Sequence, residues 1–289
     1  MTKCIAFHSY KGGTGKSTIG SNMAALMAKR GLNVVLLDLD VYAPSLQGYF
    51  HWSPMKWIND FLFENGEAHE VLDDMTGVLK NFHPTDSDSK STQIEGTLRV
   101  GFSNTSKDEI YGLDGAVRQE TSKVQLLRKF IMLREEIANI HNPDYIIIDT
   151  SPGIRYWSIN ALAVADTILL SLKMDGIDIE GTRIMAREIY ENFSKLGTQS
   201  FLLLNRVAGY CLPPALNQSE SQYSVVLQDQ SAVIKKLSSD LDLEIISSIP
   251  CYCDIQFNSE EYLTVLEYPK HPFTAKINEI IDTLESMKR

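Results

Sequence analysis

The sequence lacks long hydrophobic runs: no apolar stretch in its 289 residues approaches the roughly 18 residues that are needed to span a bilayer. Cysteine is scarce as well, and occurs only at Cys4, Cys211, Cys251 and Cys253. Residues 1–9 lead directly into a glycine-rich motif, so we expect no signal peptide. These absences predict a cytoplasmic protein whose thiols are reduced.

Basic residues are outnumbered too, because 27 Lys and Arg stand against 37 Asp and Glu, which gives a formal net charge of -10. This balance argues against a nucleic-acid-binding surface over the whole protein, although a local basic patch is compatible with it. Hydrophobic residues make up 44% of the chain, enough for a sizeable core. We predict one domain over residues 1–289, with loop-rich excursions around 50–115 and 206–230.

Continuous apolar runs alternate with helical patterns along the chain. Runs without polar alternation indicate strands that are buried on both faces, as in a parallel sheet covered by helices. They lie at residues 3–8, 33–38, 98–103, 145–149, 167–172, 200–205 and 244–249. Helical spacing occupies residues 16–30, 122–140, 157–165, 178–196 and 231–240. This order predicts an α/β fold with a doubly wound, mostly parallel sheet flanked by helices.

The stretch YKGGTGKST, residues 10–18, predicts a phosphate-binding loop between a strand and a helix. Its glycines let backbone N–H groups close around phosphates, and the helix N-terminus adds a positive dipole. The common motif is G-x-x-x-x-G-K-[ST], but here Tyr10 replaces the first glycine and an additional Lys11 follows it. We expect Lys16 to reach the β- and γ-phosphates and Ser17 to ligate Mg²⁺. The predicted nucleotide contacts in the loop are Gly12, Gly13, Thr14, Gly15, Lys16, Ser17 and Thr18.

Aspartates stand at the carboxyl ends of two predicted strands, the edge at which open α/β sheets bind ligands. Asp38 and Asp40 end the first of these strands, and Asp149 ends the second. We expect Asp149 to hold a Mg²⁺-bound water and Asp38 to support the same shell. Asp40 would orient the water that attacks the γ-phosphate. The predicted metal set is therefore Ser17, Asp38 and Asp149.

Together, KGGTGKST, DLDVYAPS and DYIIIDTSPG resemble the MinD/ParA family of deviant Walker A P-loop ATPases, and the likeness covers most of the chain. The resemblance implies an ATP-sandwich homodimer in which Lys11 contacts the nucleotide of the other subunit. The implied catalytic residues are then Lys11, Lys16 and Asp40. It also implies two switch segments, residues 40–45 and 149–155, which γ-phosphate and Mg²⁺ would order.

The same resemblance implies a site for the nucleotide base. In this family an asparagine at the end of a later strand reads the adenine edge, and Asn205 matches it. The segment SIPCYCD, residues 248–254, resembles the family loop that lies under the base. The predicted base contacts are Asn205, Arg206, Pro250 and Cys251.

The fold leaves the biological role open. The family likeness favours an ATP-dependent switch in spatial organisation or partition, with a protein partner that activates hydrolysis. DNA is kept as a partner on this likeness, although no dense basic cluster appears in the sequence. Direct membrane binding is not supported, because the polar face of the helical pattern at residues 272–289 nets to zero charge.

The alternative is an iron–sulfur cluster carrier or another metallocentre-assembly ATPase. The segment DVYAPS, residues 40–45, also resembles the switch of Mrp-type carriers. Those carriers have a C-x-x-C pair after the strand-end asparagine, but here Pro214 takes the second position after Cys211. One thiolate from each subunit falls short of the four ligands that common clusters need. Metal binding by Cys211, Cys251 or Cys253 stays an open question at this point.

Overall fold

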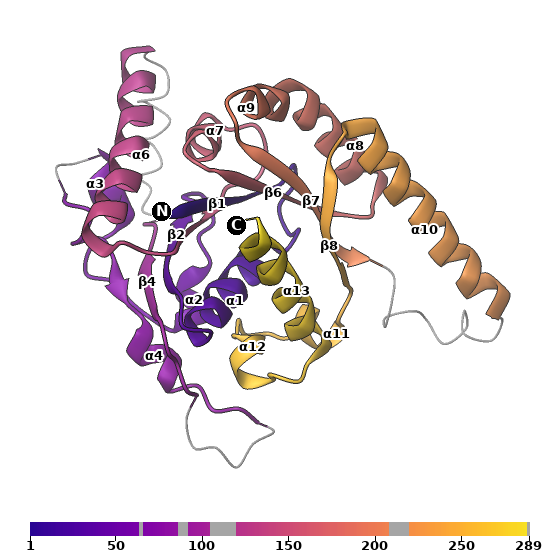
Figure 1. Ribbon diagram of the computed structural model, residues 1–289, viewed down its shortest axis with the longest axis horizontal. Coiled ribbons are helices and arrows are strands. Elements are labelled where there is room, and N and C mark those ends of the chain that lie inside the picture. Colours follow the sequence, from indigo (N-terminus) through magenta and orange to yellow (C-terminus); the bar gives the residue numbers. More distant parts are fainter. Residues whose placement is uncertain (64–65, 86–91, 105–119, 208–219, 288–289) are drawn as a thin grey trace.

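The computed structural model describes residues 1–63, 66–85, 92–104, 120–207 and 220–287. Its centre is an eight-stranded sheet in the order β3-β4-β2-β5-β1-β6-β7-β8 (Figure 1). All neighbouring strands pair in parallel except β3, which runs antiparallel to β4. The strands are β1 (Lys3–His8), β2 (Asn33–Leu39), β3 (Asp73–Asp74), β4 (Thr97–Gly101), β5 (Tyr145–Thr150), β6 (Thr167–Lys173), β7 (Gln199–Val207) and β8 (Glu244–Pro250).

Helices cover both faces of this sheet (Figure 1). One face packs against α1 (Lys16–Lys29), α2 (Leu46–Phe50), α4 (Thr76–Lys80), α12 (Thr264–Glu267) and α13 (Pro272–Ser286). The other face packs against α3 (Ile58–Phe63), α6 (Glu120–His141), α7 (Tyr156–Ala163), α8 (Gly176–Met185), the π-helical turn η1 (Ala186–Tyr190), α9 (Glu191–Lys195) and α10 (Glu220–Leu241). A short helix, α11 (Cys253–Gln256), follows β8.

The central strands are buried on both faces, as their uninterrupted apolar runs predict. In β1, Ile5 and Phe7 enter the core layer beneath α1 and α13, whereas Cys4 and Ala6 enter the opposite layer. Because successive side chains of a strand point to opposite faces, one short strand serves both layers. The predicted doubly wound α/β fold with a mostly parallel sheet is confirmed.

The strand order reverses direction around β1. β5 and then β2 lie on one side of β1, while β6, β7 and β8 follow on the other side. Loops that leave the carboxyl ends of neighbouring strands in opposite directions open a crevice at such a point, where α/β sheets bind ligands. The residues that follow β1, residues 9–15, therefore lie at the switch point of the sheet.

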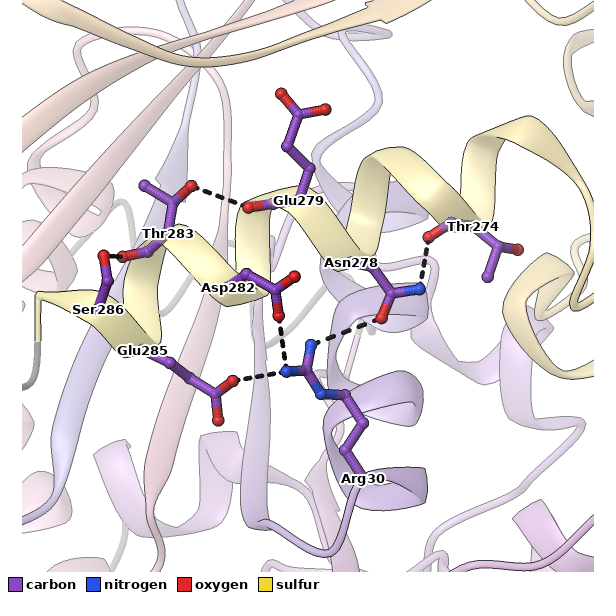
Figure 2. Close-up of polar contacts among 8 residues, drawn as sticks. All are labelled: Arg30, Thr274, Asn278, Glu279, Asp282, Thr283, Glu285 and Ser286. Carbon is purple, nitrogen blue, oxygen red and sulfur yellow. Dashed lines mark hydrogen bonds and ion pairs between the residues drawn. The ribbon is translucent and has the colours of Figure 1, made fainter.

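The C-terminal helix α13 is docked on the body of the protein. Its apolar residues Phe273, Ile277, Ile280, Ile281 and Leu284 are buried. On its outer edge, the guanidinium of Arg30 donates to Asp282 Oδ1 at 2.7 Å and to Glu285 Oε2 at 2.6 Å (Figure 2). Arg30 caps the far end of α1, so the two helices are joined there. Among the residues that the structure describes, no helix combines the length and apolar character that crossing a bilayer requires.

Three local features differ from the sequence predictions. α10 begins at Glu220, inside the interval that was expected to be irregular. Its first turns are polar, but they contain no glycine or proline that would oppose a helix. The predicted helix over 178–196 contains the π-helical turn η1, and β3 is a strand of two residues, too short to give a periodic signal.

Candidate functional site

The glycine-rich loop joins β1 to α1 and forms the floor of the site. Gly13 and Gly15 have φ angles of 72° and 90°, a region that favours glycine. Lys16 is buried, and its Nζ donates to Ser9 Oγ at 3.0 Å. Ser9 Oγ in turn donates to the carbonyl oxygen of Lys11 at 2.7 Å. Through Ser9, the ammonium of Lys16 is therefore linked to the backbone at the other end of the loop.

Tyr10 stands at the position of the first glycine of the common motif, and its side chain makes a contact that a glycine could not make. Its ring lies against Gly181 of α8 so closely that a Cβ at Gly181 would overlap the ring. The residue that replaces the first glycine thus anchors the loop to a helix on the opposite side of the sheet from α1. Sequence reasoning missed this contact, because nothing in the local pattern relates two residues so far apart in the chain.

Asp38 and Asp149 face each other as register partners on β2 and β5. The carboxylate of Asp38 accepts hydrogen bonds from the backbone N–H groups of Asp40 at 3.1 Å, and of Ser45 and Leu46 at 3.2 Å. Burial raises the pKa of Asp38 well above its ordinary value, and the charge of Asp149 adds to this effect. Asp38 therefore ties both ends of the segment 40–45 to the sheet.

Asp149 forms no hydrogen bond of ordinary geometry with the described residues, although the Ser17 hydroxyl lies close to its carboxylate. Both of its carboxylate oxygens are buried. Burial raises the pKa of Asp149 to about 6, while the positive charge of Lys16 and the nearby Ser17 hydroxyl act in the opposite direction. A buried carboxylate without a partner is costly unless a ligand satisfies it.

This arrangement fits a magnesium ion. Mg²⁺ is commonly bound by one or two carboxylates, with water and substrate phosphates completing the shell. Asp149 and Ser17 would supply oxygen ligands beside the phosphate loop, and Asp38 lies next to them. No cluster of three or more His, Cys, Asp or Glu side chains suited to a metal occurs among the described residues. The ion would therefore depend on a nucleotide for part of its shell.

Asp40 connects the two predicted switch segments. Its Oδ1 accepts a hydrogen bond from Ser151 Oγ at 2.8 Å and a longer one from the Ala43 N–H at 3.3 Å. At the outer edge of the same two segments, the Arg155 guanidinium lies 4.1 Å from the centroid of the Tyr42 ring. Segments 40–45 and 149–155 are thus in contact at two points.

His8 and Thr150 form buried hydrogen bonds at the start of the second predicted switch segment, residues 149–155. The Thr150 hydroxyl donates to Phe7 O at 2.7 Å, so His8 Nδ1 must donate to Thr150 Oγ1, also at 2.7 Å. Burial lowers the pKa of His8 to about 3, and the charge of Lys16 contributes to the same direction. The ring is therefore neutral, and it serves as a packing and hydrogen-bonding element behind the site.

Lys11 lies at the rim, and its side chain is 35% exposed. Its Nζ is 3.7 Å from Asp175 Oδ1, just before α8. Exposed ion pairs of this kind contribute little, about 0–1 kcal/mol. The two lysines of the loop therefore differ in exposure. Lys16 is buried, whereas Lys11 lies at the rim, where another molecule could contact it.

A cavity of about 130 Å³ opens beside the loop, between α1, α2 and the segment that follows β8. Asn205, Arg206 and Pro250 line it, together with Tyr49 and Tyr252. Cys251 is not among the described residues that line the cavity, and its backbone N–H donates to Val207 O at 3.0 Å. The structure thus brings three of the four predicted base contacts together in one wall.

Asn205 and Tyr49 also bind the phosphate loop directly. Asn205 Nδ2 donates to Thr14 O at 2.7 Å, and its Oδ1 accepts from the Arg206 N–H at 2.9 Å. The Tyr49 hydroxyl donates to Thr18 Oγ1 at 2.7 Å. The role of Tyr49 was missed, because a tyrosine in a short helix carries no sequence signal for this contact.

The cysteines give limited support to a metal site of their own. Cys211 lies outside the described residues. Cys4 and Cys251 are present as thiols. Cys251 Sγ contacts Gln256 Oε1 at 3.5 Å.

Comparison with protein families identifies the class. The AAA domain model matches residues 2–199, more than half of the chain. The protein therefore belongs to this family, and its relatives place it among the P-loop ATPases of the MinD/ParA type.

The curated relatives that are similar to this chain include proteins with two different functions. The sporulation initiation inhibitor protein Soj of Bacillus subtilis is 25% identical over 184 residues, which cover 63% of this chain and 62% of Soj. The chain thus matches less than two thirds of that relative's length. The cytosolic Fe-S cluster assembly factor CFD1 of Candida albicans is 22% identical over 290 residues, 97% of this chain and 86% of that protein.

Solved structures share the fold. The MinD cell division protein of Aquifex aeolicus superposes with a TM-score of 0.69 at 20% identity, covering 98% of this chain and 97% of that one. MinD of Pyrococcus horikoshii, solved in complex with Mg-ADP, gives a TM-score of 0.66 at 16% identity and covers 100% and 99% of the two chains. At these identities the likeness establishes the fold alone.

Proposed function

We propose that the protein is a Mg²⁺-dependent ATPase that forms an ATP-sandwich homodimer and works as a molecular switch. The observation that carries the proposal is the partnerless buried carboxylate of Asp149 beside Lys16 and the phosphate loop. A nucleotide with its metal ion would satisfy both charges at once. Membership of the P-loop ATPase family supports the same conclusion.

In this proposal the loop residues 12–18 cradle the phosphates through their N–H groups. Lys16 would exchange its bond to Ser9 for the β- and γ-phosphates. The base would occupy the cavity lined by Asn205, Arg206 and Pro250, with the backbone around Cys251 supporting its wall. Ser17 and Asp149 would hold Mg²⁺, and Asp38 would support its water shell. When bound, the ion neutralises phosphate charge that develops during the reaction.

Hydrolysis then needs an aligned water and compensation for negative charge. Asp40 would orient the water, whose oxygen bonds to the γ-phosphorus as the bond to the ADP oxygen breaks. Both protons of the water leave with the phosphate product. Lys16, together with Lys11 of the second subunit, would stabilise the developing charge. Because Lys11 acts only when two loaded subunits meet, dimerisation would report the presence of ATP.

The biological role we propose is spatial organisation or partition, with a protein partner that activates hydrolysis. The likeness to Soj and to MinD supports this role. DNA binding remains part of the proposal through the likeness to partition proteins. Direct membrane binding through α13 is not proposed, because its apolar face is buried.

A second candidate is assembly of iron–sulfur clusters. The observation that favours it is the similarity to CFD1, which extends over 97% of this chain. Anaerobic reconstitution followed by iron analysis tests this candidate, since a preparation without iron would remove it.

The main proposal is tested by phosphate release and light scattering. Wild-type protein should release phosphate from Mg-ATP and be monomeric with ADP, whereas Asp40→Ala should accumulate as a dimer with ATP. A monomer in every nucleotide state would overturn the switch. Binding of the trapped dimer to DNA, followed across salt concentrations, then tests the partition role.

A further inference from the structure

Ser151 makes a direct hydrogen bond to the residue proposed to orient water. Its Oγ donates to Asp40 Oδ1 at 2.8 Å, and both residues are buried. A second acceptor, Leu39 O, is 3.5 Å away. The carboxylate is nearer and charged, so it is the stronger of the two acceptors. The sequence analysis places Ser151 within the second switch segment but predicts no role for its side chain.

The donor is held on a rigid frame. Ser158 of α7 donates its hydroxyl to Ser151 O at 2.9 Å. Thr150, one residue earlier, is still paired with Leu39 of the neighbouring strand. The next turn is fixed as well, because the Gly153 N–H donates to Ser9 O at 2.8 Å. Ser151 therefore has little freedom to move relative to the sheet and the phosphate loop.

The carboxylate of Asp40 depends on this donor for its orientation. The backbone of Asp40 is fixed by its own N–H, which donates to Asp38 Oδ1. Among the described residues, its side chain accepts one other hydrogen bond, the longer one from the Ala43 N–H. Holding Oδ1 sets the plane of the carboxylate and with it the direction of the other oxygen. Small errors in such an orientation are costly for a reaction that needs in-line attack.

We propose that Ser151 is the positioning residue for Asp40, holding the carboxylate in the orientation that aligns the attacking water. This inference rests on the proposed ATP hydrolysis and on the role of Asp40 within it. Ser151 is not placed to hold ATP in the ground state. Its loss should therefore lower kcat and leave KM nearly unchanged.

The first experiment measures steady-state and single-turnover hydrolysis of Mg-ATP by Ser151→Ala. We expect kcat to fall about tenfold or more, as for loss of a hydrogen bond to a charged group, with KM within about twofold. Ser151→Thr keeps the hydroxyl and should recover most of the lost rate. Ser238→Ala is the control, because it removes a hydroxyl that donates to Leu243 O at 2.7 Å, away from the site. It should keep the wild-type kcat, and urea unfolding of each variant reports whether the fold is intact.

A double-mutant cycle then separates positioning from a general structural effect. In the Asp40→Ala background, Ser151→Ala should change the residual rate less than about twofold, since its partner is already gone. The same loss in both backgrounds would overturn the proposal, as would wild-type kcat for Ser151→Ala when Asp40→Ala is impaired. If Asp40→Ala itself hydrolyses ATP normally, it is the proposed function of Asp40 that fails.

Discussion

Asn205, at the end of β7, donates its side-chain amide to the carbonyl oxygen of Thr14 inside the phosphate loop, at 2.7 Å. The residue predicted to read the base thus also braces the loop predicted to hold the phosphates. Ser171 Oγ donates to the same carbonyl at 3.0 Å. The cavity beside the loop and the loop itself are therefore joined through one side chain.

Replacing Asn205 with alanine should weaken ATP binding by about tenfold, because a hydrogen bond of about 1 kcal/mol is lost at the loop along with any contact to the base. Isothermal titration calorimetry with ATP and with inorganic triphosphate separates the two effects. Triphosphate affinity should also fall if the brace matters. An unchanged triphosphate affinity would limit Asn205 to the base.

Lys11→Ala should lower turnover by about 100-fold or more while the monomer still binds ATP, because charge stabilisation in the transition state is lost. Phosphate release and nucleotide titration measure the two quantities. Lys173→Ala is a matched control, since Lys173 Nζ lies 3.8 Å from the same Asp175 that Lys11 approaches. Normal dimerisation and hydrolysis by Lys11→Ala would contradict a role in trans.

Asp149→Asn should stabilise the protein without nucleotide while abolishing Mg-ATP binding. Burial raises the pKa of Asp149 to about 6, above its value in the unfolded chain. The folded state then binds the proton more tightly, so its stability falls as pH rises between about 4 and 6. At pH 7 to 8 the asparagine should gain about 2–3 kcal/mol over the wild type, and this gain should shrink toward pH 4. Urea unfolding in the presence of a chelator measures it across this range.

An opposite slope, with the gain growing as pH falls, would show that Asp149 is stabilised in its charged form by the fold. That result would remove the argument that the ligand-free site carries an unsatisfied carboxylate.

Gly181→Ala should destabilise the protein by about 1–3 kcal/mol, because the new methyl group would overlap the Tyr10 ring. Alanine normally favours a helix over glycine, so the expected sign is the reverse of the usual one. The matched control is Gly176→Ala in the same helix, where a Cβ meets nothing within 4 Å. Urea unfolding and phosphate release should both respond to the first change only. Equal stability of the two variants would remove Tyr10 as an anchor.

The strands were well predicted from the sequence. Because they are buried on both faces, each one contains an uninterrupted run of apolar residues. The sequence also predicted Lys16, Asp38 and Asp149 as site residues, since Lys16 belongs to a short motif and the two aspartates lie at strand ends. Contacts between distant segments had no such signal. The bonds of Ser151 to Asp40 and of Asn205 to Thr14 depend on which strands become neighbours in the sheet, and the Tyr10–Gly181 contact depends on how α8 crosses it. The start of α10 was misplaced because polar residues suit both a loop and an exposed helical turn.

Helix α1 carries the phosphate loop at one end and is fastened to α13 by Arg30 at the other (Figure 2). Between these two ends, most residues of α1 are buried in the core layer that it shares with the sheet and α13, so the helix is held along its length as well. Rearrangement on nucleotide exchange would then be confined to segments 40–45 and 149–155, while α1 acts as the fixed reference against which they move. Helix α13 lies away from the reacting atoms, but it would in this way keep α1 in place. Shortening α13 should therefore reduce the conformational difference between the nucleotide states.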